Sequence, residues 1–154
     1  MKSMHNVSTA AVREAALERL WGLVLVLGQL MQSGLAERGI TVARAHVMWQ
    51  LQLDGASTQR ALSRALRVTA RNVTGLVDGL EADGLVARGD HPTDRRATLV
   101  SLTPKGRALA AAMSKDQGEF AQLLFENMSE REVAGFTKAL DQVLDRLAKL
   151  MPPS

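Results

Sequence analysis

Two short stretches in the middle of the chain combine guanidinium, amide and hydroxyl groups at close spacing. The first holds Thr69, Arg71, Asn72 and Thr74 within six residues. Arginine can pair with guanine, and asparagine with adenine, through two hydrogen bonds in the major groove of DNA; threonine can contact a phosphate or a thymine methyl group. A solvated helix face would carry similar residues, so this stretch alone leaves both interpretations open.

The second stretch is Asp94-Arg95-Arg96, which lies among residues typical of a turn. Arginines on a protruding loop suit the narrow, electronegative minor groove. Asp94 lies two residues before Arg96 and can accept a charge-assisted hydrogen bond that holds this arginine extended. The alternative is an exposed ion pair worth less than about 1 kcal/mol. A polar helix followed by an arginine-tipped hairpin favours contact with DNA.

Other chemistry finds little support in the sequence. The chain has no cysteine, which excludes disulfides, thiolate ligands and cysteine nucleophiles. Its three histidines, His5, His46 and His91, lie far apart, and none has a partner at the spacing of a metal site. The sequence also lacks phosphate-binding glycine loops and hydrolase motifs. We therefore expect no enzymatic activity, no cofactor and no metal.

The distribution of charge agrees with a polyanionic partner. The chain carries a net charge of +3. The segment from Ser57 to Arg107 carries +4, from nine basic and five acidic residues, and the remainder carries −1. Basic residues are thus concentrated in the middle third, as expected if this part contacts a nucleic acid.

The middle segment has the pattern of a helix-turn-helix. Ser57 or Thr58 can cap a short helix that ends near Leu66, and Thr69 can cap the next helix after a tight connection. Four apolar residues of this second helix, over residues 69–83, recur at helical spacing and predict its buried stripe: Val73, Leu76, Val77 and Leu80. The opposite face would present the polar side chains in the manner of a recognition helix.

A β-hairpin should follow this helix. Leu85–Arg88 and Ala97–Leu102 can form strands, and the Gly, Asp, Pro and Thr residues between them suit a loop. Thr103 can then cap a further helix that has Pro104 in its first position. The hairpin over residues 85–102 would be a wing with both arginines at its tip.

Long helices should flank this segment. Thr9 to about Gly34 is apolar on nearly every side, and Thr41 can cap a second helix through about Leu53. Towards the C-terminus, Ser129 and Glu132 form a capping box at the start of the last helix. That helix carries apolar residues at alternating spacings of four and three, which form a coiled-coil-like seam: Phe136, Leu140, Val143, Leu147 and Leu150.

This seam has two interpretations. The last helix could pack on its own domain. Two long apolar helices, however, offer more apolar surface than the core of one small domain can absorb, which favours a homodimer. The dimer interface would comprise Leu20, Val24 and Leu27 of the first helix together with the seam of the last.

Two stretches resemble the MarR family of winged helix-turn-helix regulators. They are VTGLVDGLEADGLV at residues 73–86, with Arg88 downstream, and DRRATLVSLTPKG at residues 94–106. The resemblance is strong from about Gly39 to Gly106 and covers the terminal helices only by position and length.

The resemblance implies a dimer of chains with the order α-β-α-α-β-wing-α-α, interlocked through their terminal helices, on a pseudo-palindromic operator in double-stranded DNA near a promoter. It also implies that Arg96 enters the minor groove and that Asp94 orients it. Gly75 stands where many members carry an arginine, so this chain should read bases with fewer charged groups. The full set of expected DNA contacts is Thr58, Thr69, Arg71, Asn72, Thr74, Asp94, Arg95, Arg96 and Lys105.

The resemblance further implies regulation by small aromatic or phenolic molecules bound between the dimer helices and the winged lobe. Trp21, His46 and Trp49 are the candidate lining residues. The alternative is that both tryptophans belong to the core and that His46 has no ligand role. A switch based on thiol oxidation is excluded because the chain has no cysteine.

We therefore predict a mostly α-helical, α+β winged helix-turn-helix fold with a dimerisation helix at 8–38, a DNA-binding lobe at 39–106 and C-terminal dimerisation helices at 107–151. The expected function is that of a cytoplasmic, sequence-specific repressor that could also control its own gene. The alternative is a winged-helix protein-interaction module, which would have no reason to keep a basic wing tip. The longest apolar run, Leu20–Leu27, is far shorter than the ~20 residues of a membrane span, so we expect no membrane association.

Overall fold

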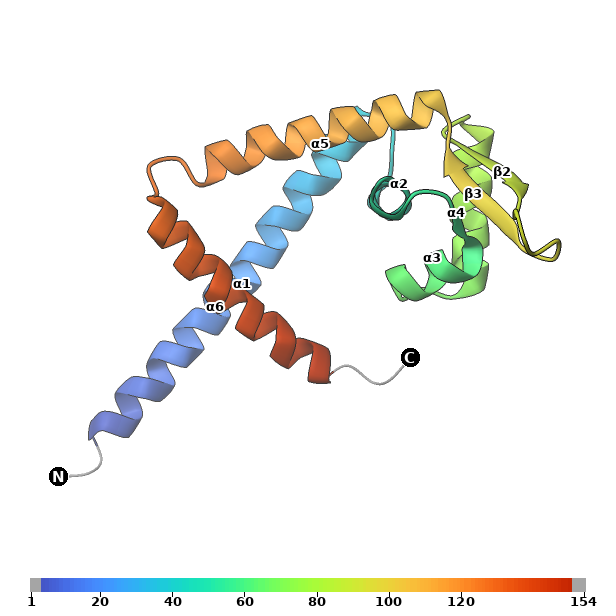
Figure 1. The fold of residues 1–154 in the computed structure, drawn as a ribbon. Coiled ribbons are helices and arrows are strands. Elements are labelled where there is room, and N and C mark those ends of the chain that lie inside the picture. Colours follow the sequence, from blue (N-terminus) through green and yellow to red (C-terminus); the bar gives the residue numbers. More distant parts are fainter. Residues whose placement is uncertain (1–3, 151–154) are drawn as a thin grey trace. The chain divides into compact units, whose positions relative to one another are not determined.

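The computed structural model describes residues 4–150 of the 154-residue chain, with side chains from Thr9 onward. The chain divides into two compact units, with the boundary between Val47 and Met48. The described elements follow one another in the order shown in Figure 1: α1 (Met4–Glu37), α2 (Val42–Asp54), β1 (Ser57–Thr58), α3 (Gln59–Leu66), α4 (Ala70–Ala82), β2 (Val86–Asp90), β3 (Thr98–Leu102), α5 (Pro104–Leu124) and α6 (Glu130–Leu150).

The first unit contains the long helix α1 and the start of α2. Helix α1 begins at Met4, five residues before the expected start at Thr9. It ends in a Schellman motif, in which Gly39 has a φ of +71° and the N–H of Ile40 donates to the carbonyl of Leu35 at 3.1 Å. Helix α2 then starts as predicted, because the hydroxyl of Thr41 accepts the N–H of Arg44 at 3.3 Å.

Helices α3 and α4 form the predicted helix-turn-helix in the second unit. Residues 67–69 connect them, and the first of these, Arg67, has a left-handed φ of 53° and donates its N–H to the carbonyl of Arg64. The predicted apolar stripe of α4 is confirmed. Its Val73, Val77 and Leu80 are completely buried, as is Leu62 of α3, and Leu76 is half-buried.

The hairpin of the predicted wing is also present. Strands β2 and β3 pair antiparallel, with Val86 opposite Leu102 and Asp90 opposite Thr98. The strand β1 adds to the other edge of β3 and completes a sheet in the order β1-β3-β2. From their own pattern the residues of β1 were expected to cap a helix, and the order implied by the family resemblance has a strand at this place. The observed order also contains one helix more before the sheet than the α-β-α-α-β-wing-α-α arrangement.

The start of α5 approaches the base of the hairpin very closely. The Thr103 hydroxyl donates to the carbonyl of Gly84 at 2.6 Å, and its N–H donates to the carbonyl of Leu85 at 3.1 Å. A Cβ atom on Gly106 would lie 1.9 Å from the Leu85 carbonyl oxygen, which no side chain tolerates. Only glycine therefore allows the first turn of α5 to lie against this carbonyl.

Helix α6 begins with the predicted capping box. The Ser129 hydroxyl accepts the N–H of Glu132 at 3.3 Å, and the Glu132 carboxylate accepts the N–H of Ser129 at 2.8 Å. Hydrogen bonds from the Ser129 side chain, and then from its backbone, lower the pKa of Glu132. The Phe136 ring contacts Phe125 at the turn from α5, with 6.0 Å between the ring centroids. The seam thus begins with a residue that packs partly on its own chain.

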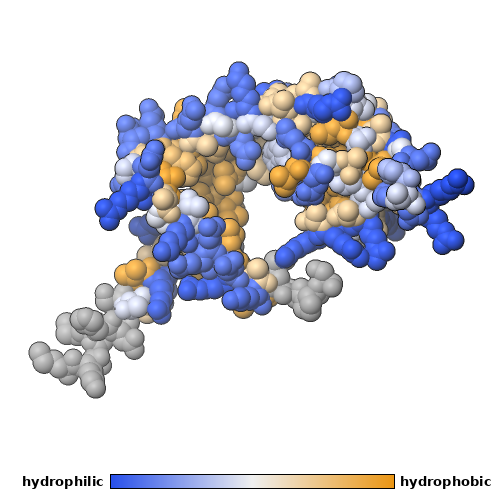
Figure 2. All heavy atoms as spheres, in the orientation of Figure 1, coloured by the Kyte–Doolittle hydropathy of each residue, from blue (hydrophilic) through white to orange (hydrophobic). Residues whose placement is uncertain are grey.

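The helices α1 and α6 leave much of their apolar surface exposed in the single chain. Within the described part of α6 no residue is buried. In Figure 2, apolar residues, coloured orange, are visible at the surface next to hydrophilic residues, coloured blue. None of the described helices is long and apolar enough to cross a membrane. The large apolar side chains that stay exposed on the two helices are Val12, Leu17, Trp21, Leu23, Val24, Leu25, Val26, Leu27, Leu30, Phe136, Leu144, Leu147 and Leu150.

Gly106→Ala should destabilise the protein, because its methyl group must push α5 away from the Leu85 carbonyl. We expect a loss of roughly 1–3 kcal/mol in the free energy of unfolding, measured by circular dichroism in urea. Gly118→Ala is the matched control. It lies in the same helix, has nothing within 4 Å of an added Cβ, and should be neutral or stabilising. Equal stability of the two variants would contradict this close approach.

Candidate nucleic-acid interface

The first turn of α4 presents two polar side chains that are ready to bind. Arg71 and Asn72 are exposed, and among the described residues neither side chain makes a hydrogen bond or an ion pair. Both lie at the N-terminal end of the helix, where the unpaired N–H groups and the helix dipole favour an anionic partner. The opposite face of the helix is held in the core by its buried stripe. The fold therefore aims both side chains away from the protein.

The three threonines predicted at this site all have structural hydrogen bonds. Thr58 and Thr69 cap their helices by accepting the N–H groups of Ala61 at 3.1 Å and Asn72 at 3.2 Å. Each hydroxyl keeps its own proton and can still donate it, for example to a phosphate oxygen. The caps thus place both hydroxyls at the helix ends that would face a nucleic acid.

Thr74 connects the two helices of the helix-turn-helix. Its hydroxyl donates to the carbonyl of Ala70 at 3.0 Å and accepts from the amide of Gln59 at 3.0 Å. Gln59 was not predicted from the sequence, because it lies 15 residues away and no local pattern links the two. Thr74 therefore has less freedom to contact a base than Arg71 or Asn72 does.

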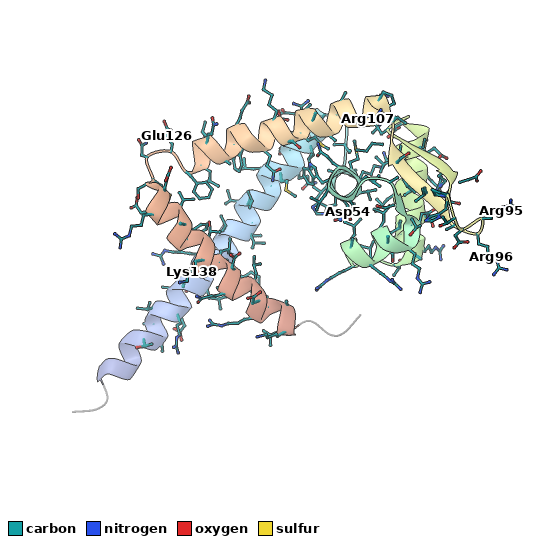
Figure 3. The ribbon with its side chains drawn as sticks, viewed as in Figure 1. Asp54, Arg95, Arg96, Arg107, Glu126 and Lys138 are labelled. Carbon is teal, nitrogen blue, oxygen red and sulfur yellow. The ribbon has the colours of Figure 1, made fainter. Side chains whose placement is uncertain are left out.

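The arginines of the wing tip project from the end of the hairpin, as Figure 3 shows for Arg95 and Arg96. Both are exposed, and no bond to their guanidinium groups occurs among the described residues. Asp94 acts differently from the expectation. Its carboxylate accepts the backbone N–H of Arg96 at 3.0 Å and not the guanidinium. The short aspartate side chain closes a local turn onto its own backbone, so it shapes the loop and leaves the arginine side chain unrestrained.

Lys105, the last of the predicted contacts, lies in α5, and its side chain reaches the C-terminal end of α4. Its ammonium donates to the carbonyl of Asp83 at 2.8 Å, immediately after α4. The 13 residues of α4 span about 20 Å, so this ammonium is far from the first turn that carries Arg71. The structure thus gives Lys105 a bond that ties α5 to the end of α4.

Arg88 joins the hairpin to α4, a role that was not predicted from the sequence. Its guanidinium forms ion pairs with Asp78 and, at 3.0 Å, with Glu81, and its N–H donates to Glu81 at 3.2 Å. The hydrogen bond to Asp78 raises the pKa of Arg88; burial opposes this rise and Glu81 adds to it. The signal in the sequence is two acids three residues apart, hence on one helix face, with an arginine in the following strand.

The residues predicted to line an effector site lie on α1 and α2. Trp21 is 62% exposed, so the interpretation that both tryptophans are core residues is wrong for Trp21 in the single chain. His46 is exposed and Trp49 is half-buried. The latter two lie three residues apart and share one face of α2.

The residues predicted at the dimer interface are accessible to different extents. Val24, Leu27, Phe136, Leu147 and Leu150 are exposed, whereas Leu20, Leu140 and Val143 are half-buried. Residues 9–150 contain no group of three or more acids or histidines that could hold a metal ion. The side chain of His5 lies outside the described residues.

Comparison with known proteins places the chain among transcription regulators. The model of the MarR family matches residues 38–97. The transcriptional repressor YetL of Bacillus subtilis is 28% identical over 149 residues, which cover 94% of this chain and 89% of YetL. The multiple antibiotic resistance protein MarR of Escherichia coli is 30% identical over 117 residues, which cover 75% of this chain and 81% of MarR. The structure of Streptococcus pneumoniae FabT in complex with DNA has a TM-score of 0.75 and 25% identity, over 92% of this chain and 99% of FabT.

Arg88→Gln should loosen the attachment of the wing to α4, because two carboxylates lose their counter-ion. Both carboxylates are largely exposed, so water screens the pair and the expected cost is about 1 kcal/mol in the free energy of unfolding. The deficit should shrink in 1 M NaCl, where surface charges are screened. Arg60→Gln, at an exposed arginine of α3 without an ion pair in the described chain, is the control and should show no deficit. A salt-independent deficit would argue against an electrostatic clamp.

Proposed function

The chain belongs to the MarR family of DNA-binding transcription regulators, and on this premise we propose that it is a repressor that binds a pseudo-palindromic operator as a homodimer. It is a regulator and not an enzyme. The observation that carries the proposal is that Arg71, Asn72, Arg95 and Arg96 are all exposed without partners in the described chain, on two elements that Arg88 clamps together. That its relative YetL is named a transcriptional repressor supports the direction of regulation.

The first turn of α4 would enter the major groove. In the proposed half-site complex, Arg71 binds a guanine and Asn72 an adenine, each through a bidentate contact. The hydroxyls of Thr58 and Thr69 donate to backbone phosphates, which set the register of the helix without reading sequence. Gly75 is exposed and would leave room for the backbone of α4 to approach the bases.

The wing would reach the neighbouring minor groove. Its two tip arginines are attracted where this groove is narrow and its negative potential is strong. Asp94 contributes indirectly, because its bond to the N–H of Arg96 shapes the turn from which both arginines extend. Lys105 has its ammonium on the carbonyl of Asp83, so we assign it to the support of the wing rather than to DNA contact.

A second copy of the chain would cover the apolar faces of α1 and α6. The interface includes Leu20, Val24 and Leu27 of α1 and, in α6, Leu140, Val143, Leu147 and Leu150 together with the exposed part of Phe136. We assign residues 8–38 and 107–151 to dimerisation and 39–106 to the DNA-binding lobe. Two lobes about one helical turn of DNA apart would then engage both halves of a palindrome.

A small aromatic molecule would relieve repression. Trp21, His46 and Trp49 are the proposed contacts, since the exposed indole of Trp21 offers a flat apolar surface on which an aromatic molecule can stack. Such an effector acts by binding better to a dimer whose lobes are spaced wrongly for DNA, and it weakens operator affinity by that difference. If an effector leaves both lobe spacing and operator affinity unchanged, this mechanism fails.

The test of the proposed function is binding to DNA from upstream of the protein's own gene, followed by fluorescence anisotropy. We expect tight binding with a steep loss of affinity as salt rises, and much weaker binding to random duplex. Arg96→Ala should weaken specific binding by roughly 1–3 kcal/mol and leave the oligomeric state intact. Arg131→Ala, at an exposed arginine of α6, should bind as the wild type does. Equal, weak binding to both duplexes would favour a protein-interaction module.

Leu147→Asp should break the dimer, because it places a charge in the apolar seam of α6. The variant should sediment as a monomer in analytical ultracentrifugation and lose operator binding. Leu53→Asp is the control, since Leu53 is 81% exposed on α2 and lies outside the proposed interface. If the Leu147→Asp protein stays dimeric, the seam of α6 is not part of the dimer interface and packs on its own chain instead.

A further inference from the structure

The loop at the tip of the wing is organised around the imidazole of His91. Its Nδ1 atom accepts the backbone N–H of Thr93 at 3.2 Å and that of Asp94 at 3.1 Å. The Thr93 hydroxyl lies 3.3 Å from the same nitrogen. The N–H of His91 donates to the carbonyl of Ala97 at 3.3 Å and closes the loop at its base. One histidine thus bonds to both sides of the loop.

A second cap follows directly along the chain. The Asp94 carboxylate accepts the N–H of Arg96, and the Asp94 carbonyl accepts the N–H of Ala97 at 3.1 Å. The two caps are linked, because the residue whose N–H bonds to His91 is the one whose carboxylate holds Arg96. His91 therefore restrains Asp94, and Asp94 in turn restrains the backbone that carries both tip arginines.

The two N–H donors dictate the charge state of the imidazole in this arrangement. A backbone N–H can only donate, so Nδ1 must present its lone pair and any ring proton must be on Nε2. An imidazolium carries protons on both nitrogens and would direct an N–H at two other N–H groups. Histidine is also the side chain whose charge ordinarily changes between pH 5 and 8. Protonation of this ring and the observed cap exclude each other.

We propose that His91 is a positioning residue for DNA binding: as a neutral imidazole it fixes the wing tip, and on protonation it releases the tip and lowers the preference for operator over random DNA. The proposal rests on the proposed function of the wing. The charged residues that flank His91 along the hairpin sequence are Asp90, Asp94, Arg95 and Arg96. An imidazolium beside the tip arginines also attracts phosphate, so non-specific binding rises as specific binding falls.

The experiment is the ratio of operator affinity to random-duplex affinity between pH 7.5 and pH 5.5. For the wild type we expect this ratio to fall by about five- to tenfold, the effect of losing a hydrogen bond or two that orders the tip. His91→Asn should bind as the wild type at pH 7.5 and keep its ratio at pH 5.5, because an amide oxygen accepts the same N–H groups without titrating. His91→Ala should have the low ratio at both pH values.

A control variant and a measurement without DNA isolate the wing. His5→Asn, at a histidine outside the wing to which no role is assigned, should retain the wild-type fall. In the free protein, the amide protons of Thr93 and Asp94 should be protected from hydrogen exchange at pH 7.5 and lose that protection at pH 5.5, and His91→Asn should keep it. Protection factors are compared rather than rates, because intrinsic exchange itself depends on pH.

The outcomes separate this proposal from the proposed function. If the wild type binds operator and random duplex equally well at every pH, the proposed function fails. The amide measurement then still decides whether His91 caps the loop. If His91→Asn shows the same fall as the wild type, or His91→Ala binds normally at pH 7.5, the positioning role is overturned although the operator binding stands. Protection that is absent at pH 7.5 overturns the cap itself.

Discussion

The wing depends on the contact between the first turn of α5 and the carbonyl of Leu85. Gly106 permits this approach, and Thr103 bonds to both Gly84 and Leu85 across it, so the base of the hairpin is fixed to the start of the next helix. Above the base, Arg88 holds β2 to α4 through two carboxylates. At the tip, the bonds of His91 and Asp94 shape the loop. The base, the strand β2 and the tip of the hairpin are thus each held by their own hydrogen bonds or ion pairs, and the tip arginines extend from this restrained hairpin.

Local sequence patterns predicted the features whose causes are themselves local. Thr69 as a helix cap, the capping box of Ser129 and Glu132, and the hairpin between Leu85 and Leu102 all depend on residues within a few positions of one another. Hydrophobic periodicity identified the buried face of α4, because one face of an amphipathic helix must leave water. The same pattern fixed which side chains of α4 stay accessible, and so it found Arg71 and Asn72.

The features that the sequence did not predict arise where distant segments meet. Gln59 and Thr74, or Lys105 and the carbonyl of Asp83, share no periodicity that would pair them. Strand β1 is two residues long and pairs with the distant strand β3, so its own residues show the pattern of a helix cap and not that of a strand. Asp94 was expected to bond to the guanidinium of Arg96. Its carboxylate bonds instead to the backbone N–H of that residue. That choice depends on the turn geometry, which residue types alone do not specify.

Gly75 leaves α4 free to accept other residues at this position. Nothing lies within 4 Å of a Cβ atom added there, and the residue is exposed in the middle of α4. A glycine inside a helix costs about 1 kcal/mol relative to alanine, so nearly any replacement would strengthen the helix rather than weaken it. Mutations that alter a binding surface usually have to be tolerated by the fold first. At this position that requirement is absent, so under the proposed mode of DNA binding a single substitution could change which operators a lineage's protein prefers, without compensating changes elsewhere.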